Sequence, residues 1–152
     1  MDKEKIIAML PYAIPFHFVD ELIEVDENGA TGSYTFAKDL EFYRGHFMGF
    51  AVTPAVILTE AAAQIGVVCL GIYLLAEQGK FEMGKFGVAM SSCQMEFLKP
   101  VFPGEKVRVS SEKIYFRFNK LSCRVRMENQ SRELVCRGVI SGMLTAGKDG
   151  GN

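Results

Sequence analysis

The sequence has 152 residues, of which 49% are hydrophobic and 23% are charged. This composition excludes a disordered chain, and the length is that of one globular domain with a core that needs no metal or disulfide support. The formal net charge is −1, so the chain lacks the positive excess that a nucleic-acid-binding protein uses against phosphates. We therefore expect no nucleic-acid partner, and without a basic amphipathic stretch we expect no membrane partner.

The apolar pattern predicts a single domain over residues 1–146, followed by a flexible tail at 147–152. The apolar run at 6–10 is too short for a signal peptide. Two weaker strand patterns, at 17–26 and 30–37, flank a turn sequence DENG. His17 is expected on a face of the first of these strands.

The longest predicted helix covers residues 54–78. Pro54 suits the first helical position, Thr53 suits the N-cap, and Gly79 suits the end. The segment is apolar almost all the way round, which is typical of a buried helix. Its unbroken apolar run at 65–76 is too short to cross a bilayer.

The second half of the chain predicts antiparallel strands. Apolar and polar residues alternate over 121–127, as in a half-buried strand. The alternation changes phase between 107–109 and 114–118, which predicts a β-bulge near 111–113. One buried helix with five or six strands indicates the α+β class, with the sheet wrapped on the helix. Turns or loops are predicted at 99–104, 119–120 and 129–132.

His46 is the first candidate for chemistry. It lies in the segment GHFMG at 45–49, where glycines on both sides predict a loop with unusual backbone geometry. Histidine has the unperturbed pKa nearest neutrality, which suits a general base. The alternative is a structural histidine bonded to a backbone carbonyl, and the pattern alone leaves both open.

Glu60 is the second candidate, because it is an acid inside an apolar helix. A buried carboxylate is unfavourable unless it is paired or functional, and burial would raise its pKa and keep it protonated, ready to donate. Gln64 lies one turn later on the same face and could orient the carboxyl group. The alternative is a structural acid bonded to an arginine or to backbone amides.

The start of the predicted helix is the third feature. The N–H groups of Ala55 and Val56 have no acceptor inside the helix, and they would polarise a carbonyl oxygen placed there. Other nucleophile types carry a weaker signal. The segment SSC at 91–93 has no neighbouring histidine and no nucleophile elbow.

The cysteines and methionines are predicted to be packing residues. None of the four cysteines forms a C-x-x-C pair, so we expect reduced thiols and a cytoplasmic protein. The chain has only two histidines, which would make a zinc site unusual. The residues expected to fill the core are Cys69, Cys93, Cys123, Cys136, Met83, Met90 and Met95.

Three segments together are more specific than any one residue: GHFMG at 45–49, Pro54, and LTEAAAQ at 58–64. This combination resembles the 3-hydroxyacyl-[acyl-carrier-protein] dehydratases of the hotdog fold. Members of that family carry a GHFPG loop, a PG helix start and an EAxAQ segment. Fourteen positions separate His46 from Glu60, as in the family's catalytic pair. Segments at 10–20 and 97–105 extend the resemblance over most of the chain.

The resemblance implies a hotdog fold, in which an antiparallel sheet wraps around one long central helix. It implies a homodimer, or a trimer of dimers, in which the histidine of one subunit faces the acid of the other. It also implies an enzyme that converts a (3R)-3-hydroxyacyl thioester on an acyl carrier protein to the trans-2-enoyl thioester and water. Neither a metal nor an organic cofactor is required.

The resemblance also assigns roles to residues. His46 would remove a proton from the carbon beside the thioester, and Glu60 would protonate the departing hydroxyl. The N–H of Ala55, with that of Val56, would hold the carbonyl oxygen. The supporting residues would be Phe47, Gly49 and Gln64.

Departures from the family pattern affect the surroundings of the catalytic pair. Met48 replaces a proline, Phe50 and Ala51 replace a commoner Arg-Pro or Asp-Pro pair, and Ala55 replaces a glycine. Two further positions also differ: Thr53 stands where a methionine is usual in the family, and Glu96 where an arginine is usual. We therefore expect a dehydratase of fatty-acid synthesis or of a specialised pathway that makes a polyene-like acyl chain.

Two other functions remain open at this point. A hotdog thioesterase would use a carboxylate to activate water, and its products would be a free acid and a thiol. A non-catalytic subunit would bind an acyl carrier without turnover. The retained pair of His46 and Glu60 favours elimination over both.

Overall fold

The computed structural model describes residues 1–145, and the tail predicted at 147–152 lies outside them. The helical elements are α1 (Lys3–Ala8), the 3-10 turn η1 (Glu41–Arg44), α2 (Ala55–Ala63), the π-helical segment η2 (Gln64–Val68) and α3 (Cys69–Glu77). The strands are β1 (Glu21–Asp26), β2 (Gly29–Thr35), β3 (Gly87–Phe97), β4 (Lys106–Arg117), β5 (Lys120–Glu128) and β6 (Leu134–Thr145).

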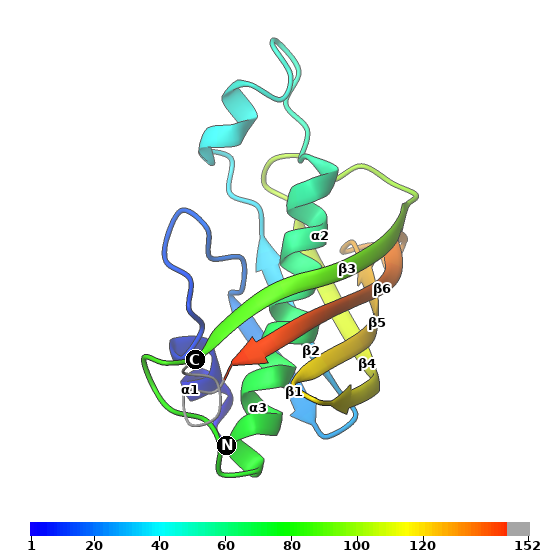
Figure 1. Ribbon diagram of the computed structural model, residues 1–152. Helices are drawn as coiled ribbons and strands as arrows, with labels where there is room; N and C mark the ends of the chain where they lie inside the picture. The colour runs from blue at the N-terminus through cyan, green and yellow to red at the C-terminus, as the bar shows by residue number, and fades with distance from the viewer. Residues whose placement is uncertain (146–152) are drawn as a thin grey trace.

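The six strands form one sheet in the order β1-β2-β4-β5-β6-β3, and each neighbouring pair is antiparallel. Figure 1 shows this sheet curving around the long helix, with β3 and β6 on one side of it and β1 and β2 on the other. The predicted α+β class and the wrapped sheet are confirmed. Because β3 lies at one end of the strand order, one of its edges has no neighbouring strand among residues 1–145.

The long helix runs through α2, η2 and α3 and forms the centre of the core. Ile65, Leu70 and Ile72 are fully buried, which explains why the sequence is apolar on all sides of the helix. Its 23 residues are long and apolar enough to span a membrane by length and composition, but 78% of the most apolar window is buried inside the fold. It is therefore the core helix of this domain.

The start of the helix differs from the prediction. Pro54, not Thr53, is the N-cap, because Pro54 has extended backbone angles (φ −60°, ψ 138°) and the helix begins at Ala55. The Thr53 hydroxyl is instead hydrogen-bonded to the hydroxyl of Tyr43. A cap formed by Thr53 is therefore wrong, and that side chain ties the segment before the helix to η1.

The predicted strand at 17–26 begins only at Glu21, so His17 lies in the preceding loop rather than on a strand face. The reason is a contact with the central helix. The N–H of Phe18 and the carbonyl of Phe16 are bonded to the side chain of Gln64, so they are not available for pairing with β2.

Two predicted irregularities in the second half are shifted. The register of β4 against β5 changes between Lys113 and Tyr115, which places the bulge at Ile114 rather than at 111–113. The hairpin turn is formed by Phe118 and Asn119, with φ values of 50° and 62°, rather than by 119–120. The predicted turn at 129–132 is confirmed by the bond from the N–H of Arg132 to the carbonyl of Asn129, which closes it.

Candidate active site

Glu60 lies in the middle of α2 and is about half-buried. Burial raises the pKa of its carboxyl group, and the hydrogen bond from Gln64 lowers it by a smaller amount. Its hydrogen-bond partner in the described chain is an amide, Gln64, and not an arginine or a backbone N–H. The structural alternative of an arginine-paired acid is therefore wrong, and the carboxyl group has an oxygen free to meet a ligand.

Gln64 is fully buried and holds three groups at once. Its side-chain nitrogen donates to Oε2 of Glu60 at 2.9 Å and to the carbonyl of Phe16 at 3.1 Å. Its side-chain oxygen accepts from the N–H of Phe18 at 2.8 Å. These bonds fix which end of the Gln64 amide faces the acid. Glu60 therefore lies next to an N–H donor, and its Oε2 can accept this hydrogen bond even when the carboxyl group is protonated.

Two cavities meet at Glu60. The outer groove, of about 430 Å³, lies between α2 and β3 and is lined by Ala55, Val56, Thr59, Glu60, Met90, Cys93, Met95 and Phe97. The inner cavity, of about 210 Å³, is lined by Tyr12, Phe16, Glu60, Ala63, Val67, Val68, Val88, Met90, Ile140, Ser141 and Gly142. Glu60 and Met90 belong to both, so the acid stands where the two spaces join.

The helix start lies in the outer groove with the acid. Ile57 and Leu58 both donate to the carbonyl of Pro54, which leaves the N–H groups of Ala55 and Val56 without an acceptor in the described chain. Unpaired amides at a helix N-terminus attract negative charge. The groove therefore contains unpaired N–H donors and an acid with a raised pKa, about one and a half helical turns apart.

His46 lies in a loop that three backbone hydrogen bonds close, one of them from the N–H of Phe47 to the carbonyl of Phe50 at 2.6 Å. The N–H of Val52 donates to the carbonyl of His46 at 3.0 Å, and the N–H of Phe50 donates to the carbonyl of Phe47 at 3.1 Å. Gly49 has a φ of 72°, which explains the need for glycine there. The ring of Phe47 stacks on the imidazole, with 4.1 Å between centroids.

The ring of His46 has a defined tautomer. Its Nδ1 is 2.8 Å from the carbonyl oxygen of Val52. Because a carbonyl oxygen only accepts, Nδ1 carries the proton and Nε2 keeps a lone pair when the ring is neutral. The structural alternative, a backbone-bonded histidine, and the catalytic one are therefore compatible, because one nitrogen is anchored and the other keeps its lone pair.

A single chain does not bring all the predicted residues together. Glu60, Ala55 and Val56 share the outer groove, whereas His46 lines neither that groove nor the inner cavity. Figure 1 shows why: the segment before α2 projects beyond the end of the helix, away from the sheet. The site formed by Glu60 is therefore open to a base supplied from outside this chain.

Three predictions about packing residues are wrong. Cys93 is exposed, and Met90 has 44% of its surface exposed, because both side chains lie on the edge strand β3 and face the outer groove. Met83 is also exposed, at 64%. The alternation of Cys93, Met95 and Phe97 along one strand face was the sequence signal that could have placed them beside the helix.

The other three cysteines are buried as predicted. Burial raises the pKa of the thiols of Cys69, Cys123 and Cys136 to about 12, so they are unreactive near neutral pH.

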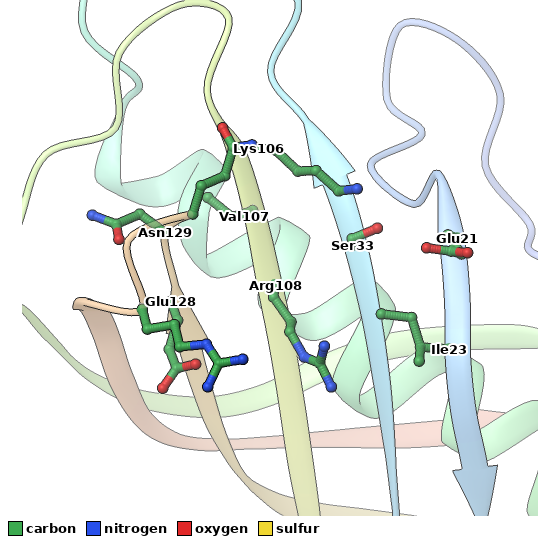
Figure 2. Close-up of a pocket in the computed structure, with 10 residues that line it drawn as sticks. Glu21, Ile23, Ser33, Lys106, Val107, Arg108, Glu128 and Asn129 are labelled. Carbon is green, nitrogen blue, oxygen red and sulfur yellow. The ribbon is translucent and has the colours of Figure 1, made fainter.

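A separate hollow of about 680 Å³ lies on the side of the sheet that faces away from the helix. Figure 2 shows Lys106 and Arg108 of β4 beside Ser33 of β2 and Glu21 of β1. Cations and acids are mixed there, and none of the predicted site residues lines it. The candidate active site is therefore at Glu60, on the helix side of the sheet.

Sequence comparison places this chain in a known family. The FabA-like domain matches residues 10–138. The 3-hydroxyacyl-[acyl-carrier-protein] dehydratase FabZ of Bacillus thuringiensis (strain Al Hakam) is 36% identical over 110 residues, which cover 72% of each chain. FabZ of Bacillus pumilus (strain SAFR-032) is 35% identical over 114 residues, or 74% of each chain. The chain therefore belongs to the FabA-like family, which includes these dehydratases, and the predicted family is confirmed.

Solved structures confirm the fold. The dehydratase heterocomplex ApeI:P from Xenorhabdus doucetiae has a TM-score of 0.76 at 12% identity and covers 91% of this chain and 90% of that chain. A thioesterase from Haemophilus influenzae has a TM-score of 0.69 at 14% identity and covers 100% and 96%. The likeness to both a dehydratase and a thioesterase shows the predicted hotdog fold. It does not distinguish elimination of water from thioester hydrolysis.

Proposed function

We propose that this protein removes water from a (3R)-3-hydroxyacyl thioester carried by an acyl carrier protein, giving the trans-2-enoyl thioester. The observation that carries the proposal is the outer groove, where Glu60, with its raised pKa, lies beside the unpaired amides of Ala55 and Val56. The FabZ relatives carry the name of this activity and match most of the chain.

In the proposed reaction, Nε2 of His46 takes a proton from the carbon next to the thioester. Negative charge then develops on the thioester oxygen, which the N–H groups of Ala55 and Val56 stabilise. Glu60 gives its proton to the hydroxyl at the third carbon, the carbon–oxygen bond breaks, and water leaves. The proton on His46 returns to Glu60 through solvent, so no net proton is consumed.

The environments of the two groups suit these roles. A general acid must hold a proton at working pH, and burial favours the protonated form of Glu60. The bond to Val52 leaves the basic nitrogen of His46 free. A thioesterase would need an ionised carboxylate to activate water, which the burial of Glu60 disfavours.

The proposed assembly is a homodimer, or a trimer of dimers, in which the His46 loop of one subunit reaches the outer groove of the other. Two observations support it. His46 lines neither cavity of its own chain. In addition, Phe47, Met48 and Phe50 expose 57%, 91% and 59% of their surfaces, which is unfavourable unless a partner covers them.

The proposed setting is cytoplasmic acyl-chain synthesis. The altered residues Met48, Phe50 and Ala55 surround the catalytic pair rather than replace it, which favours a pathway with a modified, polyene-like chain over general fatty-acid synthesis.

The direct test uses purified protein and 3-hydroxyacyl carrier thioesters, with products read by mass. Loss of one water supports the proposal, whereas release of the free acid would indicate hydrolysis. The variants His46→Ala and Glu60→Gln are each expected to lower kcat/KM by about 10²–10⁴-fold. Normal turnover in either variant would contradict the proposed roles.

Mixing the two inactive variants tests the shared site. A mixed dimer of His46→Ala and Glu60→Gln subunits would contain one intact site and one that lacks both groups. About half of randomly mixed dimers are mixed, so activity should recover to about a quarter of the wild-type value. No recovery, with subunit exchange confirmed by mass, would show that both groups act within one chain.

A further inference from the structure

The hollow on the side of the sheet that faces away from the helix contains cations without a partner in the fold. Lys106 and Arg108 lie on β4, Arg132 lies in the turn between β5 and β6, and all three line this space of about 680 Å³. Within residues 1–145, none of the three side chains has an ion-pair or hydrogen-bond partner. Their charge is therefore available to a ligand of the hollow.

Arginines elsewhere on this face of the sheet do have partners. Arg124 donates to Glu112 at 2.8 Å, and Arg126 donates to Glu128 at 3.4 Å. These residues share the face with Arg108, because Glu112 lies four positions after it on β4 and side chains alternate between faces along a strand. The lack of partners is therefore a property of the hollow and not of every arginine on this face.

Ser33 adds a buried hydroxyl to the same hollow. It lies opposite Arg108 in the register of β2 against β4, and only 2% of its surface is exposed. Its side-chain oxygen has no hydrogen-bond partner within residues 1–145, although buried hydroxyls are normally bonded. Figure 2 shows Ser33 beside Lys106 and Arg108. The hydroxyl can therefore donate to a group that enters the hollow.

These donors have the chemistry of a phosphate site. The planar guanidinium of Arg108 can bind two phosphate oxygens at once, and a lysine ammonium and a serine hydroxyl each add one donor. The volume of about 680 Å³ lies within the range of small-molecule sites and exceeds the needs of a single phosphate. The ligand therefore carries further groups beside its phosphate.

The acids of the hollow indicate what those further groups are. Glu128 is already bonded to Arg126, whereas Glu21 has no partner within residues 1–145 and lies opposite Ser33 in the register of β1 against β2. A carboxylate repels phosphate but accepts hydrogen bonds from hydroxyl and amino groups. A nucleotide has phosphates at one end and such donors at the other.

We propose that this hollow binds the phosphate groups of a nucleotide through Lys106, Arg108, Arg132 and the hydroxyl of Ser33, with Glu21 accepting a hydrogen bond from the rest of the ligand. The site lies on the opposite side of the sheet from Glu60, so it does not depend on the proposed dehydratase function. Free phosphate shares the anionic chemistry, and the experiment distinguishes the two sources.

The test titrates the intact protein with ADP, inorganic phosphate and adenosine in a calorimeter. ADP is expected to bind more tightly than phosphate, and adenosine is expected not to bind. Arg108→Gln should increase the Kd for ADP about tenfold or more, because it removes a charged donor, and Ser33→Ala should increase it by about two- to tenfold. Binding of phosphate alone would keep the anion site and remove the nucleotide. No binding of either anion would overturn the proposal.

The matched control is Arg124→Gln, which removes one positive charge from the same face at an arginine that is ion-paired. It should change the Kd for ADP by less than about twofold. If it weakens binding as much as Arg108→Gln does, the face attracts anions without a site, and the proposal fails. Amide chemical shifts of the wild type give a test that needs no variant: ADP should shift Ser33 and Arg108, and shifts confined to other strands would overturn the proposal.

Discussion

The side-chain amide of Gln64 donates a hydrogen bond of 2.9 Å to Oε2 of Glu60 while its other bonds hold the backbone of Phe16 and Phe18. One buried amide thus joins the acid of the candidate site to the loop at 11–18, which contributes two residues to the wall of the inner cavity. The position of the acid and the shape of the cavity are therefore linked.

Gln64→Met removes these bonds with little change in volume. We expect the free energy of unfolding to fall by about 1–3 kcal/mol, because the N–H of Phe18 and the carbonyl of Phe16 lose their partner. The pKa of Glu60 should rise, since the bond from Gln64 lowers it. The alkaline limb of the kcat/KM profile should then move to higher pH. Gln94→Met, at an exposed position on β3, is the control, and an unshifted limb would rule out a positioning role.

The free energy of unfolding should depend on pH because of Glu60. Its pKa is higher in the folded protein than in the unfolded chain, so the folded state binds more protons between the two values. The free energy of unfolding therefore falls as pH rises from the ordinary carboxyl range through the raised pKa. Glu60→Gln removes this dependence, and its Tm relative to wild type should increase with pH. A difference in Tm that is constant with pH would contradict the raised pKa.

Two glycines of β6 should respond differently to alanine. A Cβ at Gly138 would overlap the main-chain oxygen of Gln94 on β3, whereas a Cβ at Gly142 makes ordinary contacts. We expect Gly138→Ala to lower the free energy of unfolding by about 1–3 kcal/mol, with Gly142→Ala within about 0.5 kcal/mol of wild type. Urea denaturation measures both, and equal effects would mean that β3 and β6 are not so closely paired.

The exposed loop at 45–53 should control assembly. Met48→Glu places a charge where the proposed dimer buries an apolar side chain, so we expect the dimer Kd to increase at least tenfold in sedimentation. Phe118→Glu is matched to it, because Met48 and Phe118 both expose 91% of their surfaces. Equal behaviour of the two variants would place the interface elsewhere.

The sequence predicted the parts of the site that depend on local pattern. The apolar helix, its start near residue 55 and the acid within it follow from periodicity and from the residue types. The family motif predicted the hotdog fold, which is confirmed, and the pairing of His46 with Glu60, which stays a prediction. Gln64 was predicted to orient Glu60, and the hydrogen bond between them is present.

The remaining features depend on contacts between segments that are distant in the sequence, and hydrophobic periodicity does not predict such contacts. The loop at 16–18 is held by a residue 46 or more positions away, and this shortened β1. Met90 and Cys93 are residue types that are common in cores, yet they lie on β3, which is an edge strand of the six-stranded sheet, and both are exposed. Their exposure became visible only once the strand order was known.

The π-helical geometry of η2 also determines how the length of the long helix through α2, η2 and α3 can vary. A π-helical segment bonds residues five apart rather than four, so it holds one more residue than the α-helical turn it replaces. Deleting a single residue within Gln64–Val68 would therefore return the segment to an α-helical turn and leave α3 nearly in phase with α2, whereas inserting one more residue would rotate α3 by roughly 100°. Natural deletions of one residue should accordingly be tolerated better than insertions in these five positions, and both should be more frequent in the surface connection at 79–86.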